Sequence, residues 1–132
     1  MQISLRHFSP GEFRCKDGCG GGIEHMNQDL LMMLDQVRDR AGIPLVLSSA
    51  YRCPAHNQAV GGVDDSAHTR GYAVDIKCIN SHTRFLILQA ALEVGFRRIE
   101  LAPTWVHLDN RTSRRTSPFT SMEVNTDGNH RD

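Results

Sequence analysis

The sequence predicts a small single-domain α+β fold in which helical and extended segments follow one another along the chain. With 132 residues, of which 39% are hydrophobic, the chain has enough apolar side chains for one core. Apolar residues recur at spacings of three and four in two segments and alternate with polar residues in others. These segments come in the order helix, strand, strand, helix, strand, and no internal repeat divides them.

The first predicted elements are a helical turn and a long helix. Ser9-Pro10-Gly11-Glu12 combines an N-cap residue, a proline at the first helical position and an acidic first turn. Residues 25–41 carry one apolar stripe, and Gly42 follows as a C-cap. We expect this helix to pack on a sheet. The stripe consists of Met26, Leu30, Met33, Leu34 and Val37.

Two strands separated by a long loop are predicted next. Residues 43–50 are aliphatic and then small, which is typical of a buried strand that leads into a functional loop over residues 51–67. Residues 71–78 alternate between apolar and other side chains. Val74 and Ile76 therefore share an apolar face, and Asp75 points to the opposite face.

The remaining predicted elements are a helix and a final strand or hairpin. Residues 82–94 favour a helix that ends at Gly95, with Phe85, Leu88 and Leu92 on one side. The final strand or hairpin is indicated by Ile99 and Leu101, followed by residues 105–108.

A polar segment follows these elements. Residues 111–132, RTSRRTSPFTSMEVNTDGNHRD, are rich in Ser, Thr and Arg and have few apolar side chains to bury. The sequence therefore predicts a domain over residues 1–110 and a flexible tail over residues 111–132.

The balance of charges excludes several classes of partner. The 15 Lys and Arg residues are matched by 15 Asp and Glu residues, so the chain lacks the one-sided positive charge of proteins that bind nucleic acids or acidic lipids. The stretch MQISLRHFSPGEF has no basic segment followed by an apolar run, and no stretch of the chain is long and apolar enough to cross a bilayer. We expect cytoplasmic synthesis without a signal peptide, no membrane insertion, no nucleic-acid partner, and a monomer.

Four cysteines leave two interpretations open. Without an export signal, reduced thiols are expected rather than disulfides. Cys15 and Cys19, in FRCKDGCGGG, have a spacing that would supply half of a structural zinc site, completed by His25 or Cys53. The favoured interpretation is a glycine-rich turn whose buried thiols pack as small hydrophobic groups. The other cysteine is Cys78.

The stretch SAHTRGYAVDI, residues 66–76, suggests a metal centre. It places His68 and Asp75 on either side of a turn at Gly71. Zinc binds imidazole nitrogen and carboxylate oxygen, and a catalytic zinc has three protein ligands and a water molecule. A third candidate ligand is His107 in WVHLD, which strand alternation puts on the face opposite Val106 and Leu108. The pattern predicts one zinc ion per chain.

These residues resemble the signature of an enzyme family. SAHTRGYAVDI is similar to the pattern Ser-x-His-x-x-Gly-x-Ala-x-Asp of the M15 zinc peptidases, the D-Ala-D-Ala carboxypeptidase group that includes phage peptidoglycan endolysins. SSAYRCPAHN resembles the family's Ser-x-Tyr-Arg loop, and WVHLD resembles the segment with its last histidine ligand. The resemblance extends over residues 8–110. It implies an antiparallel sheet with flanking helices that cradles one zinc, as in D-Ala-D-Ala dipeptidases and the Hedgehog signalling domain, with His68, Asp75 and His107 as ligands.

The same resemblance suggests further site residues. Arg52 occupies the position of the family's arginine, where a guanidinium stabilises the oxyanion of amide hydrolysis or binds a substrate carboxylate. Tyr51 and Ser66 are candidate substrate-binding residues, although Ser66 is equally suited to a local turn.

The general base departs from the family pattern. Relatives have Glu or Asp three residues before the last histidine, but this chain has Thr104 there, which does not accept a proton near neutral pH. Glu100 and Asp109 are the nearest carboxylates. We favour Glu100 as the base, whereas Asp109 shares a strand face with His107 and is placed to orient it.

Three functions are consistent with these patterns. The first is a zinc peptidase that hydrolyses an amide bond in the peptide stem of peptidoglycan, next to a D-amino acid, as a carboxypeptidase or endopeptidase. As a phage endolysin it would reach the cell wall only after release, for example by a holin. The second is a zinc-containing module that binds the cell wall or a protein and has lost catalysis, as Thr104 suggests. The third is a structural-zinc or redox protein built on the four cysteines.

Overall fold

A five-stranded sheet organises the protein, which a computed structural model describes over residues 5–61 and 66–110 and, for the backbone alone, residues 121–124. The strand order is β1-β2-β4-β3-β5. The first four strands in this order pair antiparallel, and β5 pairs parallel to β3. Their bounds are β1 Leu47–Ser49, β2 Ala73–Lys77, β3 Arg98–Leu101, β4 Trp105–Asp109 and β5 Ser121–Val124.

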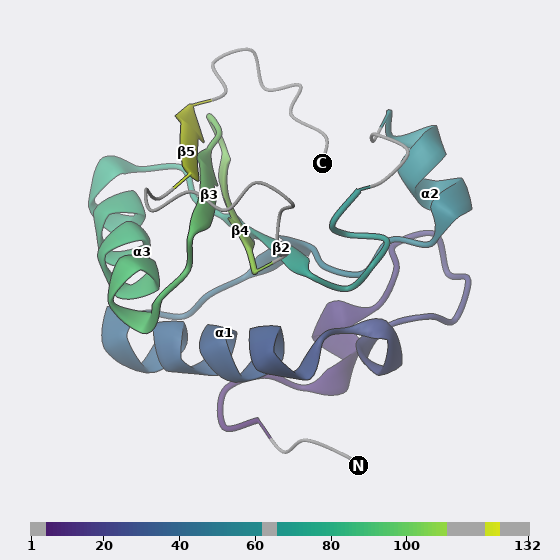
Figure 1. The fold of residues 1–132 in the computed structure, drawn as a ribbon, viewed down its shortest axis with the longest axis horizontal. Helices are drawn as coiled ribbons and strands as arrows, with labels where there is room; N and C mark the ends of the chain where they lie inside the picture. The colour runs from purple at the N-terminus through teal and green to yellow at the C-terminus, as the bar shows by residue number, and fades with distance from the viewer. Residues whose placement is uncertain (1–4, 62–65, 111–120, 125–132) are drawn as a thin grey trace.

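The helices α1 (Gln28–Ala41) and α3 (Ser81–Val94) lie side by side, whereas α2 (Pro54–Ala59) lies apart from both (Figure 1). Two short 3-10 turns, η1 (Pro10–Phe13) and η2 (Ile23–His25), precede α1. Within the described residues, no helix is long and apolar enough to cross a membrane. The small α+β fold with an antiparallel sheet is confirmed, with a parallel strand added at one edge.

Helix α1 begins later than the sequence predicts. The expected helix over residues 25–41 is interrupted, because Asn27 is an N-cap whose side chain accepts a hydrogen bond from Leu30 N at 2.9 Å. A cap of this kind contributes about 1 kcal/mol to stability. At the other end, Gly42 is left-handed with φ 69°, as expected for a C-cap. The buried face comprises Leu30, Leu31, Leu34, Val37 and Ala41.

Helix α3 has the predicted extent but packs with a different face. Asn80 caps its start by accepting from Thr83 N at 2.8 Å, and Gly95 ends it with φ 113°. The expected apolar side is not the buried one, because Phe85 and Leu92 are 58% and 43% exposed. The buried side chains are Ile87, Ala90 and Ala91. Two of these are small, which lets the helix pack close to its neighbours.

The two faces of the sheet have different chemistry. On β2 and β4, Val74, Ile76, Val106 and Leu108 are fully buried and belong to the main core. Their neighbours along each strand point to the opposite face. The strand predicted over residues 71–78 is confirmed as β2, and the predicted hairpin is β3 and β4. The strand predicted over 43–50 shortens to β1, and the loop predicted over 51–67 contains α2.

A short strand, β5, lies within residues 111–132, the range for which the sequence predicts a flexible tail. The strand β5 pairs with β3 in parallel, with Glu100 aligned to Glu123. The outer edge of β3 would otherwise present unpaired backbone groups, and β5 satisfies them. Residues 111–120 and 125–132 lie outside the described part of the chain. The sheet therefore includes residues 121–124, which follow the predicted domain over residues 1–110.

Candidate metal centre

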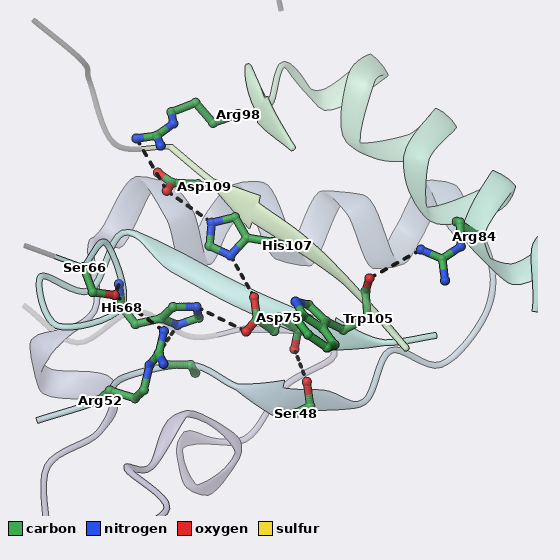
Figure 2. Close-up of polar contacts among 11 residues, drawn as sticks. Ser48, Arg52, Ser66, His68, Asp75, Arg84, Arg98, Trp105, His107 and Asp109 are labelled. Carbon is green, nitrogen blue, oxygen red and sulfur yellow. Dashed lines mark hydrogen bonds and ion pairs between the residues drawn. The ribbon is translucent and has the colours of Figure 1, made fainter. Parts of the chain in front are cut away.

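Three side chains from a turn and two neighbouring strands meet on the polar face of the sheet (Figure 2). Asp75 on β2 is directly opposite His107 on β4, so their side chains share a face. His107 Nδ1 lies 2.7 Å from Asp75 Oδ1, and His68 Nε2 lies 3.3 Å from Asp75 Oδ2. One donor atom from each residue lies within 4.8 Å of the others. The structure thus brings together all three predicted ligands.

A tight turn places His68 next to β2. Its backbone is held by hydrogen bonds from Thr69 N to Ser66 O and from Tyr72 N to Ala67 O. Gly71 closes the turn with φ 77°, and Asn27 N donates to its carbonyl oxygen at 2.8 Å. A Cβ atom at Gly71 would lie 1.9 Å from the carbonyl oxygen of His25. Only glycine fits this position without backbone movement.

Hydrogen bonds at the outer nitrogens orient both imidazoles. His68 Nδ1 lies 2.8 Å from the carbonyl oxygen of Ala50, so Nδ1 carries the proton and donates it. The other ring nitrogen, Nε2, is buried and faces Asp75 Oδ2 at 3.3 Å. His107 Nε2 lies 3.3 Å from Asp109 Oδ2, which directs Nδ1 of the same ring toward Asp75. Deprotonation of the inner nitrogens, His68 Nε2 and His107 Nδ1, would leave both rings in the tautomer that a metal ligand requires.

The donor set fits a zinc ion. Two imidazole nitrogens and one carboxylate oxygen are typical ligands of catalytic zinc, and the buried Nε2 of His68 is directed at the carboxylate that would share the metal. Burial alone would raise the pKa of Asp75, but the charges and hydrogen bonds of His68 and His107 hold it well below its ordinary value. Asp75 is therefore ionised, as a ligand must be.

Asp109 contacts His107 through Nε2, the ring nitrogen that does not face Asp75. Its carboxylate is fully buried, contacts His107 Nε2, and lies 3.7 Å from Arg98 NH1. This is the orienting position expected from the shared strand face. A carboxylate committed to an imidazole and a guanidinium is poorly placed to exchange protons with a substrate.

Glu100 lies on the same face as the candidate ligands. It is directly opposite His107 across β3 and β4, and it is half-buried. Paired residues of this kind have Cβ atoms about 4.5–5.5 Å apart. Asp75, His107 and Glu100 therefore form one row across three strands. Thr104 is exposed in the turn between β3 and β4, where its carbonyl oxygen accepts from Cys78 N at 2.9 Å.

Arg52 is buried beside the His68 turn. Only 5% of the residue is exposed, its NH2 lies 3.5 Å from Ser66 Oγ, and its backbone N–H donates to His68 O at 3.3 Å. Figure 2 shows its side chain directed toward His68. Ser66 is also fully buried, and its hydroxyl accepts from His68 N at 3.1 Å. These contacts assign Ser66 a part in building the turn.

Tyr51 and Trp105 lie differently with respect to His68, Asp75 and His107. Tyr51 stacks on His25 with ring centroids 4.5 Å apart, and its backbone N–H donates to Phe13 O at 3.4 Å. These contacts connect Tyr51 to the N-terminal loop. Trp105 was not singled out from the sequence, but its indole lies beside Asp75 in Figure 2. The alternation of β4, which places Trp105 and His107 on one face, was the available signal.

The cysteines match the favoured sequence interpretation in part. All four are free thiols, as expected; Cys15 and Cys78 are buried in the core and Cys53 packs partly against it, whereas Cys19 is exposed. Cys15, Cys19 and Cys53 also converge with Asp17, which the sequence interpretation had overlooked. Cys78 lies elsewhere, with its thiol donating to Asn80 O at 3.5 Å. A site built on all four cysteines is therefore excluded.

Comparison with known proteins identifies the family. A search of curated proteins found no match to the chain. A model of the peptidase M15 family matches residues 6–109. This range contains α1 to β4 and all three residues of the buried His-Asp-His group. The chain therefore belongs to the peptidase M15 family, which consists of zinc-dependent metallopeptidases.

Proposed function

We propose that the protein hydrolyses an amide bond in the peptide stem of peptidoglycan, next to a D-amino acid, with one zinc ion held by His68, Asp75 and His107. The observation that carries this proposal is the convergence of these donors within 4.8 Å on one face of the sheet. The substrate class is supported by the resemblance of SAHTRGYAVDI to the D-Ala-D-Ala carboxypeptidase signature.

With three protein ligands, a zinc ion at this site would keep a fourth position for water or substrate. A zinc ion held by them would supply Lewis acidity for attack of water on an amide carbonyl. The protein holds its donors in place beforehand, since Ala50 O fixes the His68 ring and Asp109 fixes the His107 ring. This preorganisation lowers the cost of assembling the site around metal and substrate.

Arg52 is proposed to act on the substrate. A guanidinium that is mostly removed from solvent interacts strongly with negative charge, because water screens it poorly. Arg52 is therefore suited to stabilise the carbonyl oxygen as it becomes negative, or to bind a terminal carboxylate through two parallel hydrogen bonds. Ser66 positions this side chain through its contact with NH2.

Glu100 is proposed as the general base, and its cross-strand position opposite His107 supports this role. Its carboxylate would accept a proton from the attacking water and pass it to the leaving amine. The competing candidate, Asp109, is fully buried and already contacts His107 and Arg98. We therefore retain Glu100 as the base and assign Asp109 to positioning.

Digestion of purified peptidoglycan, followed by mass spectrometry of the soluble products, tests this function. The expected result is a set of fragments that appears with the zinc-loaded protein and is lost with a chelator. Their masses distinguish release of a terminal D-alanine or a dipeptide from cleavage of a cross-link. Absence of any chelator-sensitive product from peptidoglycans of different cross-link type would contradict the proposal.

A binding module without catalysis is the second candidate. It is favoured by one observation, the threonine at the position where relatives carry the acid, since Thr104 lies in an exposed turn. Such a module would sediment with insoluble peptidoglycan and release no fragment from it. Cosedimentation in the same digestion experiment therefore separates the two candidates.

A further inference from the structure

A second group of potential metal ligands lies outside the group of His68, Asp75 and His107, which is called the His68 centre below. Cys15, Asp17 and Cys19 come from the turn after η1, and Cys53 comes from the segment between β1 and α2. One ligand atom from each residue lies within 4.8 Å of the others. A tetrahedral zinc with bonds of about 2.3 Å to sulfur places its sulfur ligands about 3.8 Å apart. The group has the dimensions that such an ion needs.

The turn that carries Cys15, Asp17 and Cys19 has a backbone that brings their side chains close together. Cys15 N donates to Gly21 O at 2.9 Å, so the chain doubles back within a few residues. Gly18 and Gly20 have φ values of 77° and 92°, which residues with a side chain rarely adopt. Asp17 Oδ1 also accepts from Cys19 N at 2.9 Å. These bonds bring the ligand atoms of Asp17 and Cys19 to the same side of the turn as the Cys15 thiol.

Hydrogen bonds connect the sulfur atoms of the group to backbone N–H groups and to the Asp17 carboxylate. Backbone N–H groups donate to sulfur in two places, from Cys53 to Cys15 Sγ and from Gly21 to Cys19 Sγ, each at 3.4 Å. The Asp17 carboxylate accepts the thiol protons of Cys15 at 3.0 Å and Cys53 at 2.9 Å. A metal ion would replace these protons, which is the exchange that cysteine sites undergo on binding metal.

The ligand types select the metal. Three thiolates and one carboxylate favour zinc over calcium or magnesium, which prefer oxygen ligands. Because the protein supplies all four ligands, the coordination is complete without water, as in structural rather than catalytic zinc sites. The His68 centre differs in both respects, since it has three ligands and no sulfur.

We propose that Cys15, Asp17, Cys19 and Cys53 bind a second, structural zinc ion, which fastens the N-terminal turn to the segment that carries Arg52. Cys53 directly follows Arg52 in the sequence. A ligand bond at Cys53 therefore restrains the backbone from which the Arg52 side chain reaches the His68 turn. The hydrogen bond from Tyr51 N to Phe13 O, at 3.4 Å, connects the same two segments.

Metal analysis of the purified full chain tests the site without reference to catalysis. The parent is expected to hold one more zinc ion per chain than the Cys19→Ser and Cys53→Ser variants. Cys78→Ala is the matched control, because Cys78 lies outside the group, and it should retain the parental zinc content. His68→Ala should lose the other zinc and keep the one bound by cysteine. Equal zinc content in the parent and both serine variants would overturn the proposal.

Cobalt substitution tests the cysteine site in the parent protein, so the result does not depend on whether the serine variants fold. Only a site with sulfur ligands gives a thiolate-to-cobalt charge-transfer band in the near ultraviolet, and the His68 centre has no sulfur ligand. The cobalt-loaded parent and the His68→Ala variant should both show the band. Its absence from the parent would refute the cysteine site, whereas failure to cleave peptidoglycan would bear only on the proposed function.

Discussion

Replacing Gly71 with alanine should damage the metal centre through the turn that carries His68. Two costs add at this position. A left-handed backbone with a side chain costs about 1–2 kcal/mol. The new Cβ would also lie 1.9 Å from His25 O and 2.9 Å from Met26 Cα, both backbone atoms that do not move freely. Displacing packed atoms typically costs about 1–3 kcal/mol, which brings the expected loss of stability to about 2–5 kcal/mol.

Gly42 provides the matched control for this substitution. It also has a positive φ, of 69°, but a Cβ there meets nothing within 4 Å. Gly42→Ala should therefore cost only the backbone term of about 1–2 kcal/mol. Urea unfolding of both variants in the presence of chelator measures the two costs without the contribution of bound metal. The steric argument is refuted if Gly71→Ala is no more destabilising than Gly42→Ala.

The remaining predictions concern the roles of single residues in the proposed peptidase. Arg52→Ala should keep zinc bound by His68, Asp75 and His107 but lower turnover by about 10²–10³. Arg52→Lys should restore little of this turnover, because lysine lacks the planar pair of donors. An unchanged kcat/KM in steady-state kinetics would show that Arg52 does not act on the substrate. Glu100→Gln should keep fold and zinc and lower the hydrolysis rate by about 10²–10⁴, and a near-normal rate would exclude Glu100 as the base. Asp109→Asn should weaken zinc affinity by about 10–100-fold in a competition titration against a chromogenic chelator, and an unchanged affinity would contradict its orienting role.

The elements that were predicted well have strong local signals. The alternation of residues 71–78 indicated both β2 and the side to which Asp75 points, because a strand has a period of two and leaves no other assignment. The glycine at position 71 similarly marked a turn. His68 and His107 were proposed as ligands because the motifs that contain them resemble family segments, and the structure places both side chains beside Asp75.

Other features depend on contacts between distant segments, which local patterns do not report. The buried face of α3 is set by its packing partners, so Ala90 and Ala91 are inside while the larger Phe85 is 58% exposed. The parallel strand β5 pairs with the outer edge of β3, although only two of its four residues, Met122 and Val124, are apolar. Asp17 was missed for the same reason, since its role depends on Cys53, which is far away in the sequence.

Reconstitution of activity with zinc is the most direct test of the claim that His68, Asp75 and His107 form a catalytic zinc centre. Protein stripped by chelator would be titrated with zinc while soluble peptidoglycan fragments are measured by mass spectrometry. The parent should recover hydrolysis, as should a control variant at an exposed histidine outside the site, His82→Ala. His68→Ala should recover none at the same zinc concentration. Full recovery in His68→Ala would contradict the assignment of this group as the catalytic centre.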